Sequence, residues 1–159
     1  MSTPARERIM IMTVREYLNR GYELKREIML KRQQLENISE SMTNLSVNLD
    51  GVKVMKTPTA SCIENGVVQV IELKEDIDKS VAMLAVVGNE ALQIISKLQD
   101  LRTETMLIKH YVGFKTWNDV AQEMNITYKT VMNSHHYAMT KLTRILKDSP
   151  ILEVADVAQ

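Results

Sequence analysis

Residues 116–127 read TWNDVAQEMNIT, and this stretch decides how the C-terminal third of the chain folds. Thr116 is a good helix N-cap, and Asp119 stands three residues later, near the capping-box position. Asn125 follows a predicted short helix with apolar residues on one face, and asparagine is the commonest residue other than glycine at a left-handed turn position. Thr127 offers a second N-cap. The spacing therefore predicts two helices joined by a sharp turn, which is the arrangement of a helix-turn-helix.

The second of these helices is predicted to run from Tyr128 to about Lys147. Ala121 is small, which allows the two helices to cross closely. Four apolar residues are expected to fill the core that the helices share: Val120, Met124, Ile126 and Val131. The N-terminal residues of the second helix then face outward, where they could reach base edges in the major groove.

Two long segments precede this region in the sequence. Apolar residues recur in them at alternating three- and four-residue spacing, over about 5–48 and 67–102. This is the a/d seam of a coiled coil, and the polar or glycine exceptions are Gly21 and Lys31 in the first seam and Ser80 in the second. The first seam is Val14, Tyr17, Gly21, Leu24, Ile28, Lys31, Leu35, Ile38, Met42, Leu45 and Leu49. The second is Val70, Leu73, Ile77, Ser80, Leu84, Val87, Ala91, Ile94, Leu98 and Leu101.

Turn and helix-breaking residues separate the two seams. Asp50-Gly51 and Asn65-Gly66 are turn signals, and Pro58 stops a helix from passing through. We therefore expect an all-α fold: a long antiparallel, coiled-coil-like helical hairpin over 5–101 with its loop at about 49–66, a helix-turn-helix domain over 102–147, and an acidic tail over 148–159. Val52, Val54 and Met55 leave open a short strand or docking segment inside the loop.

The apolar side chains of the two seams can be buried in two compatible ways. The two arms can pack on each other, and the hairpin can also associate with another copy or another protein, because two helices alone bury little surface. We expect the arms to pack together and consider a homo-oligomer through the hairpin as a further arrangement.

The chain has 20 basic and 20 acidic residues, but the charge is unevenly distributed. Residues 102–147 hold seven basic and three acidic side chains, a net charge of +4, and residues 148–159 hold three acids and no base. The stretch 124–147 contains no acidic residue at all. An acid-free helix is what contact with phosphates requires, so the neutral total does not exclude nucleic acid as a partner.

The sequence lacks the signals that are typical of several other classes of function. Cys62 is the single cysteine, and His135 and His136 point about 100° apart on a helix, so neither a disulfide framework nor a metal site is expected. No glycine-rich phosphate loop, nucleophile-base arrangement or paired-carboxylate signature occurs, so we expect no enzyme and no cofactor. We see no apolar run of about 20 residues and no signal peptide, so we expect a cytoplasmic protein without membrane contact.

The C-terminal third resembles region 4 of sigma-70-type transcription factors, through the stretch 117–127, Val131 and residues 138–142. More closely, the chain resembles small prophage proteins of Gram-positive bacteria that join a helical N-terminal part to a sigma region 4-like end. Residues 13–18 (TVREYL) and 111–117 (YVGFKTW) carry this resemblance, which covers roughly 13–142. Relatives of this kind, the ArpU-like group, are described as phage regulators of late gene transcription.

The resemblance implies a site in the first turns of the second helix. Asn125 stands where the family usually has glycine, and Tyr128, Lys129 and Thr130 stand where it often carries arginines, so base reading by bidentate arginine is not expected. Asn133 is suited to pair with adenine, and Lys129 to reach guanine or phosphate. The predicted DNA-binding residues are Thr127, Tyr128, Lys129, Thr130, Asn133, Ser134, His136 and Lys141.

These observations predict a phage-type transcriptional regulator that binds double-stranded DNA, with the hairpin serving oligomerisation or contact with RNA polymerase in the bacterial host cytoplasm. Two alternatives remain open. One is a DNA-recognition protein like the small subunit of a phage DNA-packaging machine. The other is a protein-interaction module that acts through the hairpin without binding DNA.

Overall fold

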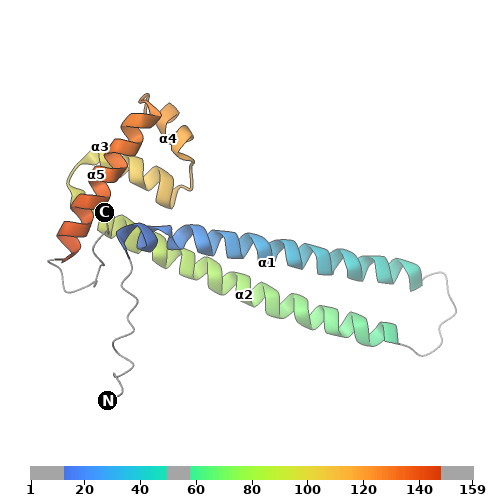
Figure 1. The fold of residues 1–159 in the computed structure, drawn as a ribbon. Helices are drawn as coiled ribbons and strands as arrows, with labels where there is room; N and C mark the ends of the chain where they lie inside the picture. The colour runs from blue at the N-terminus through green and yellow to red at the C-terminus, as the bar shows by residue number, and fades with distance from the viewer. Residues whose placement is uncertain (1–12, 50–57, 148–159) are drawn as a thin grey trace, which may run out of the picture. The chain divides into compact units, whose positions relative to one another are not determined.

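The computed structural model of the chain describes residues 13–49 and 58–147, and Figure 1 shows its elements. Every regular element in these residues is helical, and they contain no strand, so the all-α prediction is confirmed. The predicted acidic tail and the segment with Val52, Val54 and Met55 lie outside the described residues.

Two long helices are followed by a series of shorter ones. Their bounds are α1 Val14–Leu49, α2 Pro58–Ile95, the 3-10 turn η2 Ser96–Leu98, α3 Leu101–Leu107, the π-helical turn η3 Ile108–Val112, α4 Trp117–Glu123 and α5 Tyr128–Lys147. The chain divides into two compact units: unit 1 holds Met1–Tyr22 and Val86–Gln159, and unit 2 holds Glu23–Ala85. This division differs from the predicted boundary at 101/102, because the beginning of α1 and the end of α2 share the core of the C-terminal helices.

The connection between the long helices is shorter than predicted. Pro58 begins α2, a position where its missing N–H costs nothing. Asn65 and Gly66 lie inside α2, so the turn predicted there is wrong. A Cβ atom added to Gly66 would lie 2.9 Å from the Met42 sulfur, so glycine allows α1 to approach closely at this point rather than making a turn.

The second heptad helix also ends earlier than predicted. After η2, Gln99 adopts a left-handed conformation with φ 54°, and Asp100 then caps α3 by accepting a hydrogen bond from the Arg102 amide at 3.2 Å. Leu101 begins α3 and is 80% exposed, so its predicted place in the seam is wrong.

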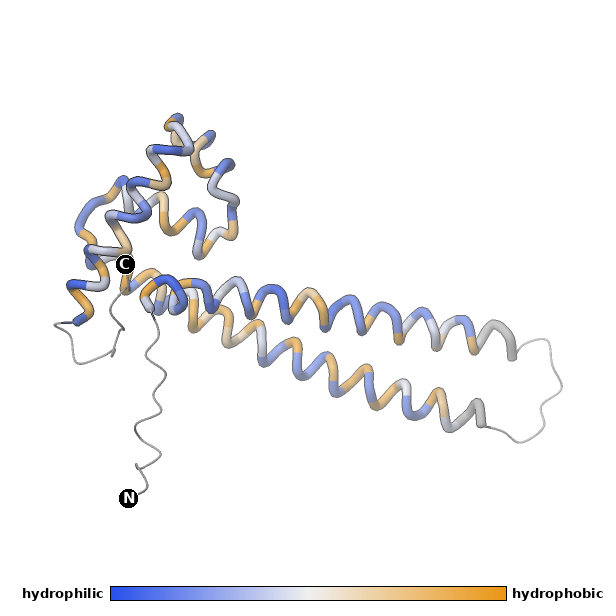
Figure 2. Tube along the Cα trace, in the orientation of Figure 1, coloured by the Kyte–Doolittle hydropathy of each residue, from blue (hydrophilic) through white to orange (hydrophobic). Residues whose placement is uncertain are grey.

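Unit 2 has a thin core. Ile28, Ile77 and Ser80 are its buried side chains among the described residues, and most of the remaining inward positions are half-buried, whereas Leu45 is exposed. The Lys31 amine donates to the Ser80 hydroxyl at 3.2 Å and pairs with Glu27 at 2.6 Å. Lys31 on α1 and Ser80 on α2, the polar exceptions of the two seams, are therefore joined by a hydrogen bond. Figure 2 shows apolar residues recurring between hydrophilic ones along both helices.

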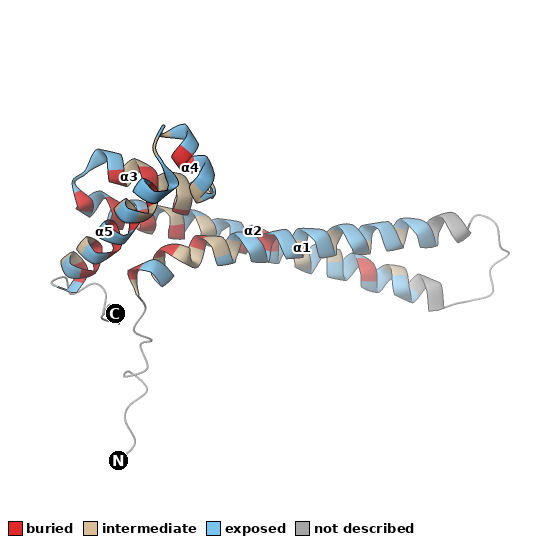
Figure 3. Cartoon of the chain, turned by 45° about the horizontal axis from the view of Figure 1, so that its top comes forward, coloured by how far each residue is buried: buried red, intermediate tan, exposed pale blue. Residues whose placement is uncertain are grey.

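Unit 1 has a deeper core, and Figure 3 shows buried residues recurring along α3, α4 and α5. Gly21, the remaining exception of the first seam, lies against this core: a Cβ added there would come within 3.4 Å of the Phe114 ring. The buried cluster is Val14, Leu18, Ala91, Ile94, Ile95, Leu98, Met106, Leu107, Tyr111, Val120, Ala121, Val131, Ala138, Met139, Leu142 and Leu146.

Candidate nucleic-acid interface

The turn between α4 and α5 places the candidate site. The Thr116 hydroxyl accepts from the Asp119 amide at 3.2 Å, and the Asp119 carboxylate accepts from the Thr116 amide at 3.3 Å, so the predicted capping box is confirmed. Asn125 has φ 52°, which confirms the predicted left-handed residue. The Thr127 hydroxyl accepts from the Thr130 amide at 3.2 Å and is the predicted second cap. These local bonds determine where α4 and α5 start.

One face of α5 is buried in unit 1 and the other is exposed. Val131, Ala138 and Leu142 are completely buried. Thr127 and five α5 positions of the predicted site are exposed: Tyr128, Lys129, Thr130, Asn133 and His136. Thr140 and Arg144 continue this face at the same helical spacing and were not predicted, although their distance from Lys129 in sequence gives the signal.

Two predicted residues lie elsewhere. The Lys141 amine donates to the Leu98 carbonyl at 2.8 Å, so this side chain closes the C-terminal end of η2 inside unit 1. Sequence alone gives no signal for this bond, because 43 residues separate the two partners. Ser134 is half-buried at the edge of a cavity beside α5. The exposed face of α5 is therefore narrower than the predicted site.

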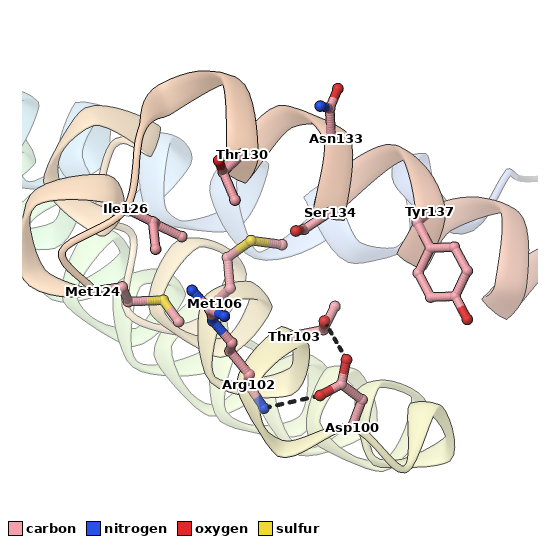
Figure 4. Close-up of a pocket in the computed structure, with 10 residues that line it drawn as sticks. All are labelled: Asp100, Arg102, Thr103, Met106, Met124, Ile126, Thr130, Asn133, Ser134 and Tyr137. Atoms are coloured by element: carbon pink, nitrogen blue, oxygen red, sulfur yellow. Dashed lines mark hydrogen bonds between the residues drawn. The ribbon is translucent and has the colours of Figure 1, made fainter.

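The cavity lies between α3 and α5 and has a volume of about 400 Å³. Its lining residues are Asp100, Arg102, Thr103, Met106, Met124, Ile126, Thr130, Asn133, Ser134 and Tyr137. In Figure 4, Ser134 faces the α3 side chains, whereas Asn133 points away from them. The Asp100 carboxylate accepts from the Thr103 hydroxyl at 2.6 Å, and this bond holds its pKa below the ordinary value. Asp100 thus caps α3, while Asn133 remains available on the outer face.

Ion pairs between residues of the C-terminal third neutralise part of its positive charge. The Lys109 amine lies 2.6 Å from the Glu123 carboxylate, and Lys115 pairs with the same carboxylate. Hydrogen bonds from both lysines hold the pKa of Glu123 below its usual value. Lys129 and Arg144 form no ion pair or side-chain hydrogen bond with the described residues. The exposed face of α5 therefore carries two cations that no described carboxylate neutralises.

A group of aromatic and histidine side chains supports the buried side of α5. The Tyr111 hydroxyl and His135 Nε2 lie 2.7 Å apart, and the rings of His110 and Trp117 stack with centroids 3.6 Å apart. Burial, helped by the charge of Arg15, lowers the pKa of His135 to about 4, and burial raises the pKa of Tyr111 to about 12. Both side chains are therefore neutral near pH 7, which suits a structural role.

The backbone around this group departs from regular helix. The π-helical turn η3 ends at Gly113, whose amide donates to the Ile108 carbonyl at 2.9 Å. A Cβ on Gly113 would lie 2.7 Å from the Lys109 carbonyl oxygen, so only glycine fits there. Phe114 takes the left-handed conformation, with φ 57°. His110 Nδ1 donates to the Lys115 carbonyl at 2.7 Å and closes the turn that leads into α4.

The described residues contain no group of three or more His, Cys, Asp or Glu side chains that could hold a metal ion. By length and composition alone, the helical stretch Ser61–Leu98 is apolar enough to cross a membrane. Ala91, Ile94, Ile95 and Leu98 at its C-terminal end are buried in the core of unit 1, but only 28% of its most apolar part is buried. A single helix that meets this criterion by length and composition only is weak evidence for a membrane span.

Comparison with models of protein families, with curated proteins and with solved structures finds no match to this chain.

Proposed function

We propose that the protein is a phage-type transcriptional regulator that binds double-stranded DNA through a sigma region 4-like helix-turn-helix formed by α4 and α5. The observation that carries this proposal is the exposed face of α5, where Lys129, Asn133 and His136 lie on a helix without any acidic residue. A helix of this kind fits the major groove, where asparagine can pair with adenine and lysine can reach guanine or phosphate.

Internal ion pairs reduce the expected affinity. Because Lys109 and Lys115 share Glu123 and Lys141 bonds to Leu98, the phosphate contacts come chiefly from Lys129 and Arg144. Two such contacts give a slope of about −2 for log K against log salt concentration. We therefore expect weak, strongly salt-dependent binding by each copy.

Fluorescence anisotropy of a labelled duplex across a salt series tests the proposal. We expect binding at low salt that weakens as salt rises, and we expect Lys129→Ala to lower both the affinity and the slope, the slope by about 1. Lys79→Ala is the matched control, because Lys79 is an exposed lysine of α2 outside the proposed interface. A folded sample that does not bind DNA at low salt contradicts the proposal.

The proposed regulator acts in the cytoplasm of a bacterial host, where its DNA target and RNA polymerase are found. Contact with RNA polymerase is a second proposed interaction, and the long helices offer exposed side chains for it. A pull-down with a DNA-free sample tests this contact: recovery of polymerase subunits supports it, and their absence contradicts it.

A further inference from the structure

The exposed side of α2 in unit 2 carries a second heptad pattern, distinct from the inward seam. Its members alternate at spacings of four and three residues, and all are exposed: Val67, Ile71, Lys74, Asp78, Val81 and Ala85. The exposed fractions of Val67, Ile71 and Val81 are 43%, 53% and 41%. We call these six residues the outer stripe. Ile77 and Ser80, by contrast, belong to the buried side of the same helix.

The outer stripe has the spacing by which one helix packs along another in a coiled coil. Four of its six members are apolar, and they lie on both sides of a central charged pair, Lys74 and Asp78. Neither of these two side chains forms an ion pair or hydrogen bond with the described residues. The stripe therefore offers apolar surface and two opposite charges to a partner.

Charge complementarity identifies the partner as a second copy. In an antiparallel pair whose two-fold axis passes at residue 76, Lys74 faces Asp78 of the second copy, and Asp78 faces its Lys74. In the same register, Ile71 faces Val81 of the second copy, and Val67 faces Ala85. Every position of the stripe then meets an apolar or oppositely charged residue.

Other arrangements of the same stripe are less favourable. A parallel, in-register pair places Lys74 against Lys74 and Asp78 against Asp78, which is repulsive. Moving the antiparallel register by one heptad places Lys74 against Ala85 and Asp78 against Val81, which leaves both charges without a partner. A polar pair in an otherwise apolar seam commonly selects register and orientation in this way.

We propose that the protein forms an antiparallel homodimer in which the outer stripe of α2 packs against that of a second copy, in the register that pairs Lys74 with Asp78. This inference does not depend on DNA binding. If the proposed function also holds, the dimer joins two weak DNA-binding units in one particle and raises the affinity through effective concentration.

Sedimentation equilibrium of the full chain tests the interface. We expect the wild-type protein to be a dimer and Ile71→Glu to raise the dimer dissociation constant by about 100-fold, because each dimer loses two buried isoleucines. Val68→Glu is the matched control: Val68 is also 53% exposed but lies outside the stripe, and we expect no change. A monomeric wild type, or equal effects of the two substitutions, overturns the proposal.

Charge reversal tests the register. Lys74→Asp and Asp78→Lys should each weaken the dimer, since each places like charges opposite each other at two points. The double variant should recover the wild-type dissociation constant, because Asp at 74 then faces Lys at 78. Loss of the dimer in the double variant, or no loss in either single variant, contradicts the antiparallel register.

Disulfide cross-linking tests the orientation in a Cys62→Ser background. Mixing an Ile71→Cys chain with a Val81→Cys chain should give a cross-linked dimer on oxidation. Each chain alone should not cross-link, because the two equivalent positions lie ten residues apart along the axis, about 15 Å, beyond the reach of a disulfide. A cross-link within the Ile71→Cys sample alone indicates a parallel pair and overturns the proposal.

Discussion

Unit 1 and unit 2 are built from the same two long helices, but they bury their apolar residues to different degrees. In unit 1, the short helices share a core with the start of α1 and the end of α2, and Leu107, Val120 and Leu142 are completely buried. In unit 2, Ile28 and Ile77 provide a thin core, while Val67 and Ile71 remain exposed on the outer side of α2. The difference indicates that unit 1 is stabilised by its own core, whereas unit 2 would gain stability from the dimer that we propose.

The largest expected contrast between the units is in the cost of truncating a core side chain. Leu142→Ala should lower the free energy of unfolding by about 2–5 kcal/mol, because a close-packed site leaves a cavity. Ile77→Ala should cost about 1–2 kcal/mol, because few side chains surround it in unit 2. Urea unfolding followed by circular dichroism measures both. An Ile77→Ala cost equal to that of Leu142→Ala would remove the distinction between the two cores.

The next effect is the acid sensitivity of unit 1. His135 has a pKa of about 4 in the folded protein, lowered by burial and then by the charges of Arg15, His110 and His136. Because this pKa lies below that of the unfolded chain, about 6.5, the contribution is fully present above pH 6.5 and is lost as the pH falls toward 4. After allowing for partial solvent screening, we expect a loss of about 2 kcal/mol.

Urea unfolding between pH 7 and pH 4 measures this loss. His135→Gln should reduce the pH dependence, because the titrating group is gone, and His136→Gln is the control at an exposed neighbouring position. An unchanged pH dependence in His135→Gln would assign the acid sensitivity to other groups.

The smallest expected effect is in unit 2. Ser80→Ala removes the hydroxyl that accepts a hydrogen bond from Lys31, but Lys31 keeps its ion pair with Glu27. We therefore expect a loss of about 0.5–1 kcal/mol in the free energy of unfolding. A thermal unfolding series checks this value against Leu142→Ala, and a larger loss for Ser80→Ala would show that the polar contact dominates unit 2.

Local signals in the sequence predicted much of unit 1. The caps at Thr116 and Thr127 and the left-handed Asn125 depend on neighbouring residues, so they could be identified before the structure was known. The end of α2 could not be predicted in the same way. Gln99 has no strong left-handed preference, and the bond between Lys141 and Leu98 joins residues that are distant in sequence.

The wrong prediction at Gly66 has a general cause, because glycine occurs for more than one structural reason. Gly66 was predicted to make a turn, yet it lies inside α2, where Met42 packs against it. Gly113 ends η3 without a positive φ, and Phe114 supplies the left-handed conformation. Glycine marks either a turn or a close approach, and only the tertiary structure distinguishes the two.

The candidate site was predicted in part. The exposed positions from Tyr128 to His136 follow from the amphipathic pattern of α5, which also allows Arg144 to be found. The pairing of Lys109 and Lys115 with Glu123 depends on how η3 and the turn after it pack against α4, and sequence patterns do not specify this packing.

An NMR titration of the full chain with duplex DNA at low salt, with backbone amide resonances assigned, tests the proposed DNA-binding role of α5 most directly. We expect the amides of 127–140 to shift, led by Lys129, Asn133 and His136, while those of unit 2 stay in place. Absence of shifts along α5, or shifts confined to Glu23–Ala85, would contradict the proposed DNA-binding role of α5.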